Sequence, residues 1–192
     1  MGRDAPHAGV WGLAPTLTLS GAFDGRPVSR ATIPLFFEKP FLASCVRQPL
    51  EWRDTARWER NSSADEENIS FDEAEGAIRF DASWNDVGDH WVYPVLAIEP
   101  SSLSGATRVA FEVKSAQDKV ENDFKTSKLM LVGDDGSTDI YLDYDPPTTD
   151  WELRYVEIPP ALEMDGITAI RIGANPLGSR CTIWLRDVSI LK

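Results

Sequence analysis

The sequence predicts an all-β fold, a sandwich or barrel of antiparallel strands. Short segments with alternating apolar and polar side chains recur from about residue 71 to the end of the chain. Turns rich in glycine and proline separate these segments, and helical periodicity is scarce. Such a pattern is typical of two-sheet sandwiches and barrels. The expected strands cover residues 77–82, 90–98, 107–114, 128–132, 139–144, 152–158, 169–174 and 181–191.

The alternation is clearest at residues 139–145, which read Asp-Ile-Tyr-Leu-Asp-Tyr-Asp. Successive side chains of a strand point to opposite faces, so Ile140 and Leu142 share one face and Tyr141 and Asp143 share the other. A tyrosine ring offers an apolar surface to the C–H face of a sugar, and a carboxylate accepts hydrogen bonds from its hydroxyls. This strand therefore indicates a surface that binds carbohydrate.

The first 49 residues are expected to form a hairpin arm or the tail of a preceding domain. Two alternating segments within residues 16–37 flank the turn dipeptide Asp24-Gly25. Pro34 places the second strand at a sheet edge or a bulge, because proline donates no backbone hydrogen bond.

Residues 50–65 are polar and strongly charged, and we expect them to be a linker. The main domain is then expected to cover residues 66–192, a normal length for one domain.

The composition limits the partners of the chain. Hydrophobic residues make up 42% of it, enough for a core, and the formal net charge is −12. This charge repels phosphate backbones and anionic lipid surfaces, so nucleic acid and membranes are not expected as partners. The N-terminal residues lack a hydrophobic signal core. The protein is either cytoplasmic, or the chain follows a removed signal or lies within a longer polypeptide. We expect the last of these, with an extracellular or periplasmic location.

Two cysteines, Cys45 and Cys181, are present, and their spacing does not indicate zinc. They are either two separate buried thiols or one disulfide that ties an N-terminal segment to the last strand. The sequence leaves both alternatives open.

The order of the segments from residue 66 onward resembles galactose-binding-like jelly-roll domains. The resemblance rests on the blocks at residues 71–78 (Phe-Asp-Glu-Ala-Glu-Gly-Ala-Ile), 91–96 (Trp-Val-Tyr-Pro-Val-Leu), 105–114, 150–158, 167–173 and 182–191. Many such domains are noncatalytic carbohydrate-binding modules attached to glycoside hydrolases or lyases. The resemblance implies a two-sheet antiparallel jelly roll that binds a poly- or oligosaccharide, with a catalytic domain in the same polypeptide as a possible partner.

Domains of this kind often hold a structural calcium ion near the first and last strands. The matching positions here are Glu73 and Asp187, and carboxylates are suitable Ca²⁺ ligands. The alternative is that both are ordinary surface acids.

The expected binding face consists of strand positions that alternate with core positions. These positions hold Tyr141, Asp143, Arg171, Trp184, Arg186, Trp91 and Tyr93. If their strands share a sheet, these side chains line one concave face. Such a face binds a polyol by aromatic stacking and bidentate hydrogen bonds. The alternative for the tryptophans is packing in the core or at its edge.

An enzyme is not expected. The chain has two histidines, His7 and His90, which excludes a three-histidine zinc site, and it has no Gly-x-Ser-x-Gly elbow. Asp143 and Asp145 have a spacing that paired glycosidase carboxylates use, so a small glycosidase or polysaccharide lyase stays an alternative. The other alternative is a structural or protein-interaction module.

Overall fold

The computed structural model describes the strands of an N-terminal segment and most of the chain after residue 45. The described residues are 16–19, 22–23, 26–27, 31–34 and 46–192, without 87, 119–123, 134–138, 161, 163 and 165. The chain divides into two compact units, Met1–Val46 and Arg47–Lys192.

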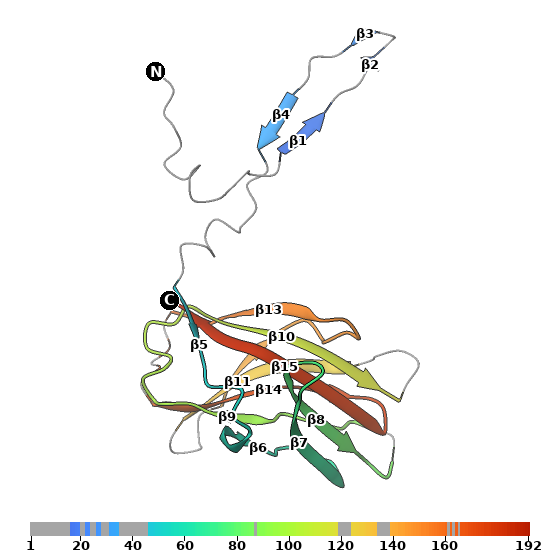
Figure 1. Cartoon of the computed structure of the whole chain (residues 1–192), viewed down its shortest axis with the longest axis vertical. Coiled ribbons are helices and arrows are strands. Elements are labelled where there is room, and N and C mark those ends of the chain that lie inside the picture. Colours follow the sequence, from blue (N-terminus) through green and yellow to red (C-terminus); the bar gives the residue numbers. More distant parts are fainter. Residues whose placement is uncertain are drawn as a thin grey trace. The chain divides into compact units, whose positions relative to one another are not determined.

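The first unit contains the predicted hairpin pairing. Strand β1 (Thr16–Leu19) pairs antiparallel with β4 (Ala31–Pro34), and β2 (Ala22–Phe23) pairs with β3 (Arg26–Pro27) (Figure 1). Pro34 is the last residue of its ladder, where a missing donor costs little. The turn dipeptide itself lies outside the described residues.

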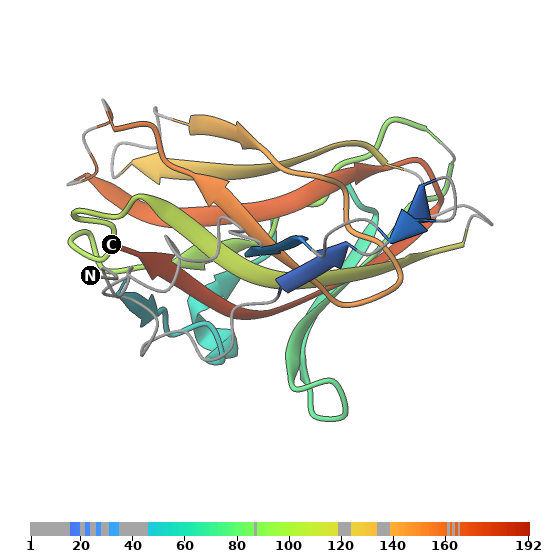
Figure 2. The same ribbon diagram turned by 90° about the horizontal axis from the view of Figure 1, so that it is seen from above.

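The second unit is a sandwich of two antiparallel sheets, seen as two stacked layers in Figure 2. The six-stranded sheet contains, in spatial order, β13 (Glu152–Glu157), β10 (Arg108–Gln117), β15 (Arg180–Leu191), β8 (Ala77–Ser83) and β7 (Glu66–Asp72), with β5 (Arg47–Pro49) beside β15. The five-stranded sheet contains β12 (Asp139–Asp143), β11 (Phe124–Gly133), β14 (Ile167–Pro176), β9 (Val95–Ala97) and β6 (Trp58–Glu59). The predicted all-β, two-sheet antiparallel architecture is confirmed. The element η1 (Thr55–Arg57) is a single 3₁₀ turn.

The core lies between the sheets and is built by the period-2 alternation of the strands. Leu129 and Leu131 of β11, and Ile170 and Ile172 of β14, are fully buried on the inner face of their sheet. Phe111 of β10 is their largest fully buried partner from the opposite sheet. Burial of these side chains is the main favourable term for the fold, and it fixes which side of each strand faces outward.

The domain boundary lies earlier than expected, because residues 50–65 are part of the sandwich. Leu50, Trp52 and Trp58 are all buried. The Trp58 indole donates a hydrogen bond to the Trp52 carbonyl with Nε1 2.6 Å from the oxygen, and its ring lies 5.1 Å from that of Phe80. Strands β5 and β6 add to β15 and β9. The expectation of a linker is corrected: a few apolar residues, spaced among many charges, complete the core.

Two further expectations concern membranes and thiols. No helix among the described residues is long and apolar enough to cross a bilayer. Cys181 is a buried free thiol on β15, and burial raises its pKa above the usual range. Its possible disulfide partner, Cys45, lies outside the described residues.

Candidate ligand-binding face

Strand register brings side chains from four strands into one row on the outer face of the five-stranded sheet. Tyr141 of β12 pairs with Met130 of β11, Met130 pairs with Arg171 of β14, and Arg171 pairs with Val95 of β9. Their strand neighbours on β11 and β14 are buried on the inner face, so the alternation directs this row outward.

A second row on the same face carries an ion pair. Asp143 of β12 pairs in register with Lys128 of β11, and Lys128 Nζ lies 2.5 Å from Asp143 Oδ1. The Asp143 side chain is 78% exposed, and Tyr141 is 56% exposed. An exposed phenol ring therefore stands beside a carboxylate and an ammonium group that solvent reaches. We call this surface the tyrosine face, which comprises Tyr141, Asp143, Lys128, Met130, Arg171, Val95 and Tyr93.

Tyr93 forms the floor of the tyrosine face. It is only 4% exposed, and its phenol donates a hydrogen bond of 2.6 Å to Asn175 Oδ1. Burial raises the pKa of Tyr93 well above its usual range, and repulsion from the Asp143 carboxylate adds to the shift. Tyr93 is thus a neutral, fixed donor and not a stacking platform.

Gly173 allows the segment of Tyr93 to approach β14. A Cβ at this position would lie 1.9 Å from the Val92 carbonyl oxygen and 2.7 Å from the Tyr93 Cα. Only glycine fits such a close backbone contact.

Trp91 lies in the same extended segment, two residues before Tyr93. Val92 between them is buried in the core, so the side chains of Trp91 and Tyr93 point to the same side of the segment. Trp91 is 37% exposed, and its backbone is held by Ser63, whose amide donates to the Trp91 carbonyl at 2.9 Å. Trp91 therefore belongs to the surroundings of the tyrosine face and keeps part of its ring accessible.

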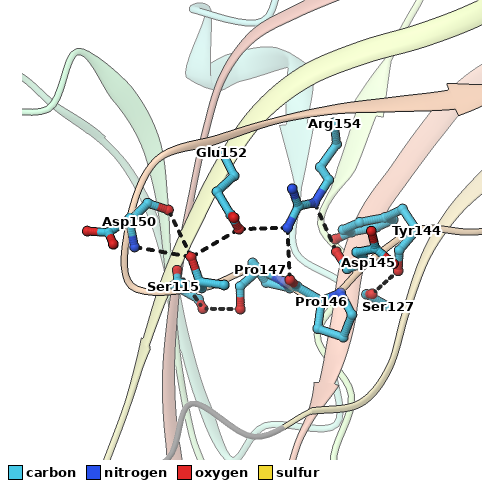
Figure 3. Close-up of polar contacts among 10 residues, drawn as sticks. Ser115, Ser127, Tyr144, Asp145, Pro146, Pro147, Asp150, Glu152 and Arg154 are labelled. Atoms are coloured by element: carbon cyan, nitrogen blue, oxygen red, sulfur yellow. Dashed lines mark hydrogen bonds and ion pairs between the residues drawn. The ribbon is translucent and has the colours of Figure 1, made fainter. Parts of the chain in front are cut away.

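The connection after β12 fixes the strand that carries Tyr141 and Asp143. Tyr144, the next residue, is buried, and its phenol donates a 3.0 Å hydrogen bond to the Gly173 carbonyl. Its ring packs edge-on against Phe111 at 5.2 Å between centroids. The carbonyl of Tyr144 accepts a hydrogen bond from Ser127 Oγ, as Figure 3 shows.

Arg154 on β13 then holds the loop that leads from one sheet to the other. Its guanidinium points into the loop and donates to the carbonyls of Asp145 at 3.1 Å and Pro146 at 3.2 Å (Figure 3). The same guanidinium pairs with Glu152 at 2.6 Å, and Ser115 Oγ donates to the Pro147 carbonyl at 3.2 Å. The end of β12 is thereby tied to both sheets, which pre-organises the tyrosine face.

Trp184 and Arg186 lie elsewhere. Both are on β15, in the six-stranded sheet, while Tyr141, Asp143 and Arg171 are in the five-stranded sheet. The condition that these strands share one sheet is not met, so the seven expected residues do not form a single face.

Trp184 and Arg186 instead take part in a self-contained group that we call the tryptophan cluster. It consists of Trp184, Trp151, Lys114, Arg186, Glu75, Asp72 and Glu112. Arg186 lies 4.0 Å from the Trp151 ring centroid, and Lys114 lies 4.8 Å from that of Trp184.

The polar atoms of the tryptophan cluster are also used within it. The Trp184 indole donates to Asp72 at 3.0 Å, and Arg186 pairs with Glu112 at 2.6 Å. The hydrogen bond from Trp184 lowers the pKa of Asp72 below its usual range. Since rings and charges already have partners, this cluster is better suited to structure than to stacking a sugar.

The two expected calcium ligands are placed by a turn and a bulge. Glu73 lies in the turn between β7 and β8, and Asp187 is in β15 at the register shift opposite β10, with a positive φ of 53°. The Asp187 carbonyl accepts a hydrogen bond from Arg47, which places a cation there. Within the described part of the chain, no three His, Cys, Asp or Glu side chains are grouped to hold a metal ion. This arrangement gives calcium binding no support, and it stays a prediction.

No family model matches the chain, and no curated protein matches it either. Solved structures do match. A family 29 carbohydrate-binding module complexed with mannohexaose superposes with a TM-score of 0.54 at 9% identity, over 77% of this chain and 92% of the module. A family 11 carbohydrate-binding module from Clostridium thermocellum in complex with a β-1,3-1,4-mixed-linked tetrasaccharide gives 0.52 at 14% identity, over 75% and 94%.

The chain has the jelly-roll fold of carbohydrate-binding modules. The family 11 module of a cellulosomal cellulase of Clostridium thermocellum agrees, with a TM-score of 0.52 at 13% identity over 74% of this chain and 92% of that one. At this level of identity the likeness shows the fold alone. The residues of a ligand site have to be argued from this chain.

Sequence reasoning missed Lys128 and Met130 on the tyrosine face. The alternation Lys128-Leu129-Met130-Leu131 predicts that Lys128 and Met130 face outward, because the two leucines between and after them lie on the inner face. It also missed Trp151 as the central ring of the tryptophan cluster, since Glu75, its hydrogen-bond partner, is 76 residues away.

Proposed function

We propose that this chain binds a neutral poly- or oligosaccharide, without catalysis, on the tyrosine face. The single observation that carries the proposal is the exposed ring of Tyr141 beside the Asp143–Lys128 pair on a rigid sheet. The ring provides an apolar platform for a sugar's C–H face, and the pair provides an acceptor and a donor for its hydroxyls. Arg171, in the same row, extends the polar surface across β14.

The charge and the comparisons support a neutral ligand. A net charge of −12 disfavours anionic polysaccharides at long range. Two of the similar structures hold mannohexaose and a β-1,3-1,4-mixed-linked tetrasaccharide, and mannohexaose is uncharged. We further propose that the chain serves as an accessory module of a carbohydrate-active enzyme that works outside the cytoplasm, because its substrate would be a polymer.

The proposal of noncatalytic binding is supported by the state of Asp143. A general acid for glycoside cleavage needs a carboxyl group in an apolar environment that keeps it protonated. Asp143 is instead exposed and ion-paired with Lys128. We expect no release of reducing sugar by the purified chain; release that disappears in Asp143→Asn would show that the chain is an enzyme.

Affinity electrophoresis in gels that contain soluble glucomannan or mixed-linked β-glucan tests the proposal. The wild-type chain is expected to be retarded by at least one polymer. Tyr141→Ala is expected to weaken binding about tenfold, while Tyr141→Phe, which keeps the ring, changes it little. The matched control is Tyr155→Ala, since Tyr155 is a 41% exposed tyrosine on β13 of the other sheet.

Two results would contradict the proposal. Folded wild-type protein that migrates unretarded on every neutral polymer would remove the function. An equal loss in Tyr141→Ala and Tyr155→Ala would remove the tyrosine face as its site.

A further inference from the structure

A polar groove of about 540 Å³ lies on the six-stranded sheet, at the end formed by β7, β8 and β15. Its lining includes Glu66, Asn68, Arg79, Asp81, Arg180 and Thr182. Figure 1 shows these three strands side by side, with β7 at the edge. We call it the β7–β15 groove.

The register arranges the groove in two rows of polar side chains. Asp81 of β8 lies between Asn68 of β7 and Thr182 of β15, and Ser83 pairs with Glu66 on one side and Arg180 on the other. The intervening residues of β8 and β15, such as Phe80 and Ile183, are buried in the core. Both rows therefore face outward, on the sheet opposite to the one that carries the tyrosine face.

Asp81 is held in a fixed orientation at the centre of the groove. Arg79 donates to its Oδ1 through Nε at 3.0 Å and Nη2 at 2.9 Å, and Thr182 Oγ1 donates to the same oxygen at 2.8 Å. Its second oxygen, Oδ2, accepts no hydrogen bond from the residues that the structure describes. A rigid sheet thus presents an oriented acceptor at the centre of the groove.

The neighbours of Asp81 supply complementary groups. Within the described part of the chain, the Asn68 amide, the Glu66 carboxylate and the Arg180 guanidinium have no side-chain or backbone partner. Donors and acceptors therefore alternate around Asp81 at the strand spacing of about 4.8 Å. Arginine charges from β8 and β15 face carboxylates from β7 and β8, so the groove favours neither an anion nor a cation strongly.

Among the residues that the structure describes, none gives the groove a free aromatic platform. Trp184 pairs with Arg79 in the next row of the sheet. Its ring already has two cationic partners, with Arg79 Cζ 5.6 Å and Lys114 Nζ 4.8 Å from the ring centroid. A ligand here is held by hydrogen bonds to several hydroxyls and not by stacking. Neutral, densely hydroxylated molecules satisfy such a set of groups best.

We propose that the β7–β15 groove is a second saccharide site, distinct from the tyrosine face and formed by Asp81, Asn68, Arg180 and Glu66. It takes a short stretch of neutral oligosaccharide with weaker affinity than the tyrosine face, because it lacks a ring. The groove's own side chains carry the inference, and only the comparison with the tyrosine face and the joining of two strands rest on the proposed function. With sites on the outer faces of both sheets, one chain joins two polysaccharide strands.

Chemical-shift mapping of the ¹⁵N-labelled full chain tests the second site, with mannohexaose and a mixed-linked β-glucan tetrasaccharide as probes. With one or both probes, two groups of amides are expected to shift in the wild type, one around Tyr141 and one along β7, β8 and β15. The double variant Asn68→Ala/Arg180→Gln removes the second group only, and Tyr141→Ala weakens the first only. Neither groove substitution removes a side-chain hydrogen bond or ion pair among the residues that the structure describes, and thermal unfolding of the double variant checks that the fold is kept.

Each outcome decides between the two sites. Loss of both groups of shifts in Tyr141→Ala, or shifts around Tyr141 alone in the wild type, would overturn the groove and leave the proposed function standing. Shifts confined to the groove would support it and contradict the tyrosine face. No shift with either saccharide at millimolar concentration would overturn both.

Discussion

The indole of Trp151 donates a hydrogen bond to the carboxylate of Glu75, with Nε1 3.1 Å from Oε2, although 76 residues separate them. The other oxygen of Glu75 pairs with Lys114 at 2.6 Å, and its backbone carbonyl accepts from Arg186 at 3.3 Å. The turn between β7 and β8 is therefore fastened to β10, to β15 and to the residue before β13. This arrangement explains why the charges and rings of the tryptophan cluster serve the fold.

The contacts of Glu75 predict a dependence of stability on acid. The hydrogen bonds from Lys114 and Trp151 lower the pKa of Glu75 below its ordinary value of 4.5. A lowered pKa in the folded state contributes stability above the unfolded pKa, and this contribution is lost as pH falls through the folded one. Urea unfolding from about pH 7 to about pH 3 should therefore show a smaller decrease in stability for Glu75→Gln than for the wild type.

Glu73 provides the control for this experiment, because it lies in the same turn and is exposed. Glu73→Gln, measured in the presence of a chelator, is expected to follow the wild-type pH dependence. Equal behaviour of the two variants would mean that the contacts of Glu75 do not couple the turn to pH.

The hydrogen bond between Tyr144 and Gly173 predicts the cost of removing one hydroxyl. Tyr144→Phe keeps the packing against Phe111 but removes a donor to a buried carbonyl, which costs about 1–3 kcal/mol. Denaturant unfolding measures the loss, and an unchanged midpoint would contradict it. The control is Tyr155→Phe, whose ring is partly exposed.

Tyr144 also predicts behaviour in alkali. Burial raises its pKa above the ordinary value of 10.0, so the neutral phenol stabilises the fold below that value. This contribution is lost as pH rises from the unfolded pKa through the folded one. The wild type should lose more stability than Tyr144→Phe above about pH 10. Parallel curves for the two proteins would show that this phenol does not ionise on unfolding.

The close approach at Gly173 predicts that a single methyl group is harmful there. A Cβ would meet backbone atoms of Val92 and Tyr93, which have no rotamer to move away, so Gly173→Ala is expected to destabilise by about 1–3 kcal/mol. Saccharide binding should weaken too, because the segment of Tyr93 is displaced. Gly166→Ala is the matched control, since a Cβ at Gly166 has none of the described atoms within 4 Å. Equal stability of the two variants would mean that the contact relaxes without cost.

Period-2 alternation was sufficient to predict which side chains of one strand face outward. It placed Tyr141 and Asp143 correctly against Ile140 and Leu142, because burial of one face fixes the register. It was insufficient for Trp184 and Arg186, which obey the same alternation on β15. The sheet to which a strand belongs depends on pairings that are distant in sequence, such as β15 between β10 and β8, and no local pattern contains them.

The same limitation explains residues 50–65. Trp58 lies among charged residues, so the local composition predicted a linker. Its ring is nevertheless buried against Phe80 of β8. Apolar side chains at irregular spacing have no period to detect, and only the assembled core shows where they pack.

The burial of Trp58 predicts a large loss of stability on its removal. Trp58→Ala leaves a cavity in the core and removes the hydrogen bond to the Trp52 carbonyl, so we expect a cost of about 3–5 kcal/mol. Trp91→Ala, at a 37% exposed tryptophan, should cost much less. Similar unfolding midpoints for the two variants would mean that residues 50–65 do behave as a linker.

The ion pair of Asp143 and Lys128 predicts how the tyrosine face binds the hydroxyl groups of a sugar. The ammonium group of Lys128 and the carboxylate of Asp143 hold each other in place, with Nζ 2.5 Å from Oδ1. We therefore expect them to bind the hydroxyl groups of a sugar together. Asp143→Ala and Lys128→Met should each weaken saccharide binding about tenfold, and the double variant should lose little more than either single one. Titration calorimetry of the four proteins with one oligosaccharide measures this coupling. Losses that add in the double variant would show that the two side chains act separately, and no loss in either would place the sugar elsewhere on the sheet.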